Sequence, residues 1–252
     1  MTLSVQGAQS FSRSIAILQM FADSNGPLSR PELAEKTDLT RPTLYRIIAS
    51  LEAEGLIESA GRGRYRLGAR LVHLARSALA QNDVRQVAGV ELERLRDATG
   101  ETVHLAIPSG DSMIYVDKVE SSEVVRMMST IGQRIALHST SVGKAYLSAL
   151  PSEKLDAFID NSDLQAVTEH TVTDPSALKS ALRDASHLGF AREEQENEKG
   201  IVCFGSPVRS HDGTPVGAIS VSVPMFRLDE DKAYGAAVAR AAASVSKRLG
   251  HR

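Results

Sequence analysis

Three segments in the second half of the chain carry side chains that could bind a small molecule. The helix start suits an anion, because the first N–H groups of a helix have no internal partner. Each of the two strands places its named residues on one face, because side chains alternate along a strand. The segments are His138-Ser139-Thr140-Ser141-Val142-Gly143-Lys144-Ala145 at a predicted helix start, the strand containing Ile201 and Cys203, and the strand containing Ser220 and Ser222. They predict a polar anion pocket. An ordinary capped helix and solvent-facing serines are the simpler alternatives.

A catalytic interpretation of the same residues is also open. Cys203 and His138 could form a nucleophile and its base, and Lys144 could form a Schiff base. Their spacing does not distinguish these roles from chance, and a lone cysteine in a strand is more often a small packing residue. The sequence has no phosphate-binding Gly-rich loop, no metal-ligand pair at helical spacing and no Gly-x-Ser-x-Gly motif. We therefore predict no enzyme activity, no cofactor and no metal site.

A second set of chemically useful side chains lies in residues 29–66, where the pattern predicts two helices and a small hairpin. Ser29 and Glu32 have the spacing of a reciprocal helix cap, and Thr40 is placed to cap the second helix. That helix has an apolar stripe of Leu44, Ile47, Ile48 and Leu51. Two short strands then flank a Gly/Arg tip. The arrangement predicts a winged helix-turn-helix.

The polar face of the second helix and the hairpin tip predict contact with double-stranded DNA. A helix fits the major groove, and arginines suit phosphates and narrow minor grooves. We assign to the major groove Arg41, Thr43, Tyr45 and Arg46, and to the wing Arg62 and Arg64. A helical hairpin for protein contact is the alternative, which would make the chain a metabolite-binding enzyme or scaffold.

Charge and composition agree with a DNA-binding segment joined to a different domain. The chain has 252 residues and a net charge of −2, yet its first 70 residues carry nine Lys/Arg against seven Asp/Glu. The single cysteine excludes an intrachain disulfide and fits a reducing compartment. No apolar run is long enough to cross a bilayer, and no signal-peptide core is present. We expect a cytoplasmic protein without a membrane partner.

The remaining periodicity predicts the elements that position these residues. A first helix carries Phe11, Ile15, Leu18 and Ala22 on one face, and a linker helix over 69–81 has an apolar stripe that suggests packing against a second copy, with intrachain packing as the alternative. After a helix that ends near Gly100, strands are predicted at 101–107, 113–119, 124–130, 190–194, 201–208 and 216–223, and helices at 142–149, 152–160, 175–188 and 229–249. This mixture predicts an α+β domain with an antiparallel sheet. The cluster Glu193, Glu194, Glu196 and Glu198 is interpreted as a solvated rim.

The ordered motifs resemble the IclR family of bacterial transcriptional regulators over nearly the full length. The resemblance is carried by Phe11-Ser12-Arg13-Ser14-Ile15-Ala16-Ile17-Leu18, Pro42-Thr43-Leu44-Tyr45-Arg46, Tyr65-Arg66-Leu67-Gly68, Tyr115-Val116-Asp117-Lys118-Val119-Glu120, Leu137-His138-Ser139-Thr140 with Gly143-Lys144-Ala145, Gly200-Ile201-Val202-Cys203 and Ala218-Ile219-Ser220-Val221-Ser222. It implies a winged helix-turn-helix over 1–68, a linker helix over 69–82 and a GAF-like effector-binding and oligomerisation domain over 83–252.

The resemblance further implies a homodimer or tetramer on promoter DNA, often a repressor of a catabolic operon, that responds to a small organic acid or sugar acid. By residue matching, the effector would meet the backbone N–H groups around Ser141 and Val142. The matching side chains are Glu193, Cys203, Ser220 and Ser222, with an apolar wall of Met127, Ile135 and Ile201. Glu193 stands where the acid-binding pattern has Asp, and the Ser141-Val142 pair replaces a Gly/Ala-type pair.

Overall fold

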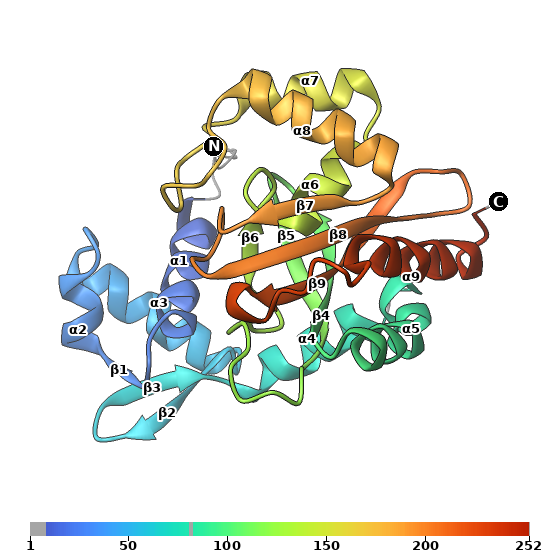
Figure 1. Ribbon diagram of the computed structural model, residues 1–252. Helices are drawn as coiled ribbons and strands as arrows, with labels where there is room; N and C mark the ends of the chain where they lie inside the picture. Colours follow the sequence, from blue (N-terminus) through green and yellow to red (C-terminus); the bar gives the residue numbers. More distant parts are fainter. Residues whose placement is uncertain (1–8, 81–82, 252) are drawn as a thin grey trace. The chain divides into compact units, whose positions relative to one another are not determined.

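The computed structural model describes residues 9–80 and 83–251, and the chain divides into two compact units, Met1–Gln81 and Asn82–Arg252 (Figure 1). Each unit has its own hydrophobic core. The helix α4 (Ala69–Ala80), predicted as a linker, falls in the first unit. Within the described residues, no helix is both long and apolar enough to cross a membrane.

The first unit is a small helical bundle with a three-stranded antiparallel sheet in the order β1-β3-β2. Its elements before α4 are α1 (Gln9–Ala22), β1 (Leu28–Ser29), α2 (Arg30–Glu35), α3 (Arg41–Ala53), β2 (Ile57–Gly61) and β3 (Arg64–Leu67). The predicted stripe of α3, formed by Leu44, Ile47, Ile48 and Leu51, is fully buried. It packs with Ile17 and Phe21 of α1, so the core fixes α3 with its polar face outward.

Two details of this unit differ from the sequence prediction. The buried residues of α1 are Ile17 and Phe21, whereas Phe11 and Ile15 of the predicted face are exposed. Thr40 occupies the cap position of α3, but its hydroxyl lies 3.0 Å from the Thr43 hydroxyl instead of bonding the backbone. The cap of α2 is confirmed, because Ser29 N–H donates to Glu32 at 2.7 Å and Glu32 N–H donates to Ser29 Oγ at 3.4 Å.

The second unit is built on a six-stranded antiparallel sheet in the order β6-β5-β4-β9-β8-β7. The strands are β4 (Thr102–Ser109), β5 (Ser112–Val119), β6 (Arg134–Ala136), β7 (Ala191–Glu194), β8 (Ile201–Arg209) and β9 (Pro215–Pro224). The helices are α5 (Asp83–Thr99), α6 (Ser141–Ser148), α7 (Ser152–Asn161), α8 (Pro175–Leu188) and α9 (Tyr234–Arg248), with a 3₁₀ turn η1 at Met225–Arg227. Helices α6, α7 and α8 cover one face, and α5 and α9 cover the other (Figure 1).

The segment predicted as a strand at 124–130 is irregular, which corrects the sequence interpretation. The backbone carbonyls of this segment bond side chains from other elements, since Ser129 O accepts from Lys118 at 2.7 Å and Val125 O accepts from Arg227 at 3.1 Å. The neighbour of β5 is instead β6. The last helix begins at Tyr234 and not at 229, because turns around Asp229 use its carboxylate and carbonyl as acceptors.

Candidate functional site

The predicted DNA-contacting residues of α3 lie on its outward face. Arg41, Tyr45 and Arg46 are exposed and Thr43 is half-buried, while the opposite stripe fills the core. Thr43, Arg46 and Ser50 also border a groove whose other wall is the start of α1, at Ser10, Phe11 and Ser14. The helix therefore offers an exposed polar, basic surface.

The predicted wing is a two-stranded hairpin whose tip is tightly turned. Gly61, Arg62 and Gly63 all have positive φ, and at Arg62 the value is 54°. A non-glycine residue in that region of backbone space is uncommon, so the turn holds Arg62 in a defined place. Arg64 has a different environment, because its guanidinium donates to Pro27 O at 2.8 Å and pairs with Glu32 at 3.1 Å.

One residue that the sequence interpretation missed connects the two parts of this surface. Arg30, the first residue of α2, donates to Tyr65 Oη of β3 at 2.5 Å and also lies against Tyr45 of α3. No short-range pattern signals these contacts, since Arg30 and Tyr65 are 35 residues apart.

The predicted anion-binding helix start lies directly on the sheet. Thr140 caps α6 by accepting from Gly143 N–H at 3.1 Å, and its carbonyl accepts from Lys144 N–H at 2.9 Å. The N–H groups of Ser141 and Val142, the first two of the helix, have no partner within it. A Cβ at Gly205 of β8 would stand 2.4 Å from Ser141 O. A glycine at 205 is therefore required for α6 to begin this close to the strand.

A small cavity opens beside this helix start. It is lined by Tyr115, Met127, Thr140, Ser141, Glu193, Asn197, Glu198, Ile201 and Cys203. Its volume of about 10 Å³ is the room of one water molecule. The structure thus brings together five of the nine predicted effector residues, and Met127, Ile201 and Cys203 form the apolar wall.

The other four predicted effector residues do not line the cavity, although all are buried. Ile135 and Val142 belong to the hydrophobic core under α6. Ser222 lies behind the wall, where its Oγ accepts from Cys203 Sγ at 3.2 Å. Ser220 pairs with Gly205 and His104 across the sheet. Tyr115, Asn197 and Glu198 also line the cavity. Tyr115 belongs to one of the motifs that carry the resemblance and Glu198 to the predicted rim, but neither was predicted as an effector residue.

Glu193 shapes the cavity by holding the loop after β7. Its Oε1 accepts from the N–H groups of Glu196 at 2.5 Å and Asn197 at 3.1 Å. Burial raises the pKa of the Glu193 carboxyl to about 7, although these two N–H groups act in the opposite direction. A proton on this carboxyl removes a negative charge from the wall, which makes the cavity more favourable for an anion.

The interpretation of the glutamate cluster as a solvated rim is wrong for two of its members. Glu193 and Glu196 are buried, and Glu196 forms an ion pair with Lys144 of α6 in which both side chains are almost fully enclosed. The second carboxylate oxygen of Glu196 accepts from Val172 N–H at 3.1 Å. The ion pair therefore connects the loop after β7 to α6, the helix whose start borders the cavity.

A buried histidine lies behind the cavity residue Tyr115. The His104 ring stacks on Tyr115 with 4.6 Å between centroids, and its Nε2 lies 2.7 Å from Ser129 Oγ. Burial, with a smaller contribution from Lys118, lowers the pKa of His104 to about 3, so the ring is neutral near pH 7. Its Nδ1 is buried without a hydrogen-bond partner among the described residues.

The residues considered for catalysis have structural partners. Burial raises the pKa of the Cys203 thiol well above its usual value, which opposes thiolate formation. His138 Nε2 lies 2.9 Å from the carbonyl of Gln165, and Lys144 is paired with Glu196. Across the described ranges, no group of three side chains suited to a metal ion occurs.

Known proteins resemble this chain in both of its units. Residues 76–247 match the family model described as bacterial transcriptional regulator IclR C-terminal, and residues 10–61 match the IclR helix-turn-helix domain. The chain is 33% identical to the HTH-type transcriptional repressor AllR of Escherichia coli strain K12, covering 97% of this chain and 92% of AllR. It is 29% identical to the acetate operon repressor of Salmonella typhimurium, covering 96% and 90% of the two chains.

Solved structures extend the match to the fold. The Thermotoga maritima IclR superposes with a TM-score of 0.79 at 31% identity, covering 96% of this chain and 99% of that one. An IclR homologue of Microbacterium hydrocarbonoxydans, complexed with 4-hydroxybenzoate, superposes with a TM-score of 0.82 at 24% identity, with coverage of 96% and 99%. These matches do not support the alternative of an enzyme or scaffold with a protein-contact module.

Proposed function

This chain belongs to the IclR family of bacterial transcriptional regulators, and we propose that it represses a catabolic operon under the control of a small organic acid or sugar acid. Both curated relatives are named as repressors, which supports repression over activation. The main structural support is the exposed basic face of α3 opposite its buried stripe. A regulator of this kind acts in the cytoplasm.

For DNA contact, we assign Arg41, Thr43, Tyr45 and Arg46 to the major groove. Arg62 suits a wing contact with phosphate or the minor groove, because it makes no hydrogen bond or ion pair within the described residues. The guanidinium of Arg64 already donates to Glu32 and to the carbonyl of Pro27. We therefore give Arg62 the direct role and Arg64 a supporting one.

For assembly, we propose that two copies pack through the apolar surface of the first unit. Val72 and Leu74 of α4 are 71% and 48% exposed, and Phe11 and Ile15 of α1 are 69% and 48% exposed. Contiguous apolar surface marks a protein interface, and Phe11 and Ile15, four residues apart, share one face of α1. A dimer places two DNA-binding modules on half-sites about one helical turn, or a multiple of it, apart.

For the effector, we propose that a carboxylate lies at the start of α6 and accepts from the N–H groups of Ser141 and Val142. The helix dipole and the protonated form of Glu193 both favour the anion there. The cavity must enlarge to admit even a small acid, so binding favours an arrangement in which the loop after β7 has moved. Such a preference for one arrangement is what allows a ligand to change DNA affinity.

The DNA-binding role is tested by fluorescence anisotropy with the fragment upstream of the chain's own coding region. We expect saturable binding that weakens steeply as salt rises, because phosphate contacts release counterions. A scrambled fragment of equal length is the control. Equal binding to both fragments at every salt concentration would contradict sequence-specific recognition.

The effector site is tested by calorimetry with pyruvate, glyoxylate, sugar acids and 4-hydroxybenzoate. Met127→Trp fills the cavity from its apolar wall and should abolish binding of the acid that binds the unchanged protein. Met128→Trp is the matched control, because Met128 is 80% exposed and outside the cavity. Unchanged binding in a folded Met127→Trp variant would place the effector elsewhere.

A further inference from the structure

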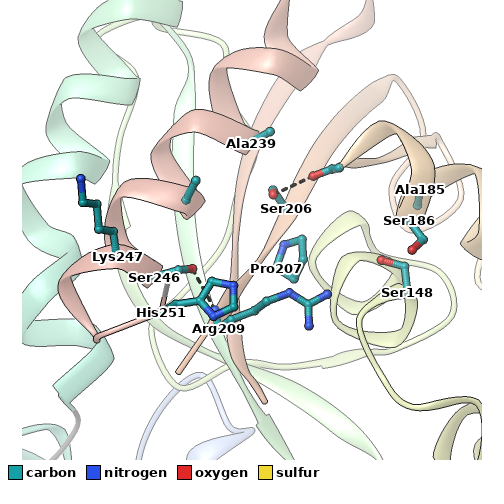
Figure 2. A pocket seen from close by; sticks show the side chains of 12 residues that line it. Ser148, Ala185, Ser186, Ser206, Pro207, Arg209, Ala239, Ser246, Lys247 and His251 are labelled. Atoms are coloured by element: carbon teal, nitrogen blue, oxygen red, sulfur yellow. Dashed lines mark hydrogen bonds between the residues drawn. The ribbon is translucent and has the colours of Figure 1, made fainter. Parts of the chain in front are cut away.

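A much larger cavity lies in the second unit, away from the residues assigned to the effector. Its volume is about 610 Å³, within the range of about 300–1,000 Å³ that is typical of small-molecule sites. It lies where β8 extends beyond the start of β7, between the ends of α6 and α8 on one side and α9 on the other (Figure 2). None of its lining residues lines the cavity beside Ser141.

The two ends of this cavity differ in chemistry. Arg209 and His251 lie together at one end, whereas Ala185 and Ala239 lie towards the other (Figure 2). The rest of the lining is Ser148, Ser186, Gly189, Ser206, Pro207, Ala243, Ser246 and Lys247. Most of these side chains are small, and none of the lining residues is acidic. One end of the cavity therefore carries the positive charge of Arg209, and the other is lined by small side chains, the methyl groups of Ala185 and Ala239 among the hydroxyls of Ser186 and Ser206.

Arg209 has hydrogen-bond donors left for a ligand. Its Nη1 donates to Gly213 O at 2.9 Å and to Ala149 O at 3.4 Å, which fixes the guanidinium in the cavity. The N–H groups on Nε and Nη2 bond no other described residue, and no salt bridge among the described residues includes Arg209. A held guanidinium with two unused donor nitrogens is suited to a carboxylate.

Three helices, α6, α8 and α9, end at the cavity, and their carbonyl ends oppose an anion there. Hydrogen bonds to the end carbonyls reduce this effect at α6 and α8. Ala149 O accepts from Arg209, and Gly189 O accepts from Ser206 Oγ at 2.8 Å. Lys247 adds a cation at the rim, with its side chain directed away from Arg209 (Figure 2).

We propose that this cavity is a second ligand site, which binds an organic monocarboxylate with an apolar body. The carboxylate pairs with Arg209 beside His251, and the apolar body lies against Ala185 and Ala239. This proposal does not depend on the proposed effector site at the start of α6. Either of the two sites can bind a ligand even if the other does not.

The test measures binding of octanoate and 3-phenylpropionate to the full-length protein by calorimetry. We expect both acids to bind, and 3-phenylpropanol, which lacks the charge, to bind at least tenfold more weakly. Ala239→Leu should weaken both acids at least tenfold by filling the apolar end. Ala236→Leu is the matched control, because Ala236 is an exposed residue of the same helix outside the cavity.

Three variants test the role of Arg209 and separate this site from the proposed effector cavity. Arg209→Gln should weaken the acids at least tenfold, whereas Arg240→Ala, which removes a charge from α9 outside the cavity, should not. Met127→Trp should leave this binding intact even though it closes the effector cavity. The proposal is overturned if neither acid binds, if folded Ala239→Leu binds them as tightly as before, or if Met127→Trp abolishes their binding.

Discussion

The guanidinium of Arg30 lies over the ring of Tyr45, with 5.1 Å between the guanidinium carbon and the ring centroid. The same group lies 5.4 Å from the centroid of Tyr65 and donates to its hydroxyl. Arg30 begins α2, Tyr45 is in α3 and Tyr65 is in β3. These contacts therefore set the position of the proposed recognition helix relative to the wing, and they give Tyr45 a structural role beside its proposed DNA contact.

Tyr45→Ala should lower both the stability of the first unit and the affinity for operator DNA. The cation–π contact contributes about 0.5–2 kcal/mol and depends on the ring, not on the hydroxyl. Tyr45→Phe should therefore keep the thermal midpoint. If Tyr45 bonds a base, the Phe variant loses affinity in anisotropy while it unfolds like the unchanged protein. A Phe variant that is destabilised as much as the Ala variant would argue against ring stacking.

Arg46→Ala should weaken operator binding by about 1–3 kcal/mol, the contribution of a bidentate base contact. The loss should be smaller on a scrambled fragment, because base contacts specify sequence. Arg183→Ala is the control, since Arg183 is exposed on α8 in the other unit. Equal losses on both fragments would assign Arg46 to phosphate.

Arg62→Gln and Arg64→Gln should separate direct and supporting roles in the wing. Each lost phosphate contact reduces the slope of log affinity against log salt by about 0.9. Arg62→Gln should show this reduction without a change in the unfolding midpoint. Arg64→Gln should lower the midpoint as well, because Arg64 holds Pro27 and Glu32. The idea fails if Arg62→Gln leaves the salt slope unchanged.

Glu193→Gln should change how stability depends on pH. The carboxyl titrates near 4.5 when unfolded and near 7 when folded, so the folded state retains a proton that the unfolded state has lost between these values. The contribution of Glu193 to the free energy of unfolding thus falls by about 3 kcal/mol as pH rises from 4.5 to 7, and is constant above 7.

The measurement is the difference in unfolding free energy between the Glu193→Gln variant and the unchanged protein at several pH values. The difference should move in favour of the variant from pH 4.5 to 7. Contributions from His104 cancel, because both proteins contain it. Glu194→Gln, at an exposed neighbour on β7 that pairs with Arg192, is the control for removing a carboxylate from the same strand. A difference that does not vary with pH would refute a raised pKa at Glu193.

Lys144→Met should destabilise the second unit by about 3–5 kcal/mol, because it leaves the carboxylate of Glu196 buried without its partner. The double variant Lys144→Met/Glu196→Gln should recover most of this loss, since no uncompensated charge then remains. Chemical unfolding of the unchanged protein, the single variants Lys144→Met and Glu196→Gln, and the double variant gives the coupling free energy between residues 144 and 196. As a control, Lys179→Ala in an exposed pair should change little. Additive losses in the double variant would contradict the pair.

Local patterns were sufficient to predict much of the framework. The stripe of α3 and the Ser29–Glu32 cap depend on residues within a few positions of one another, so periodicity and the spacing of capping residues identify them. The same is true of Ile201 and Cys203, which share a strand face and a cavity wall. Strand alternation could not reveal that Ser222 lies behind that wall.

The sequence alone therefore determined a DNA-binding module, an antiparallel effector domain and the neighbourhood of the proposed anion site, because these follow from side-chain direction along one element. Only the tertiary structure decided which buried residues meet. Lys144 and Glu196 are 52 positions apart, and the Arg30–Tyr65 contact and the cavity around Arg209 likewise join distant segments. No periodicity encodes such contacts, since they depend on how helices and strands pack once each has formed.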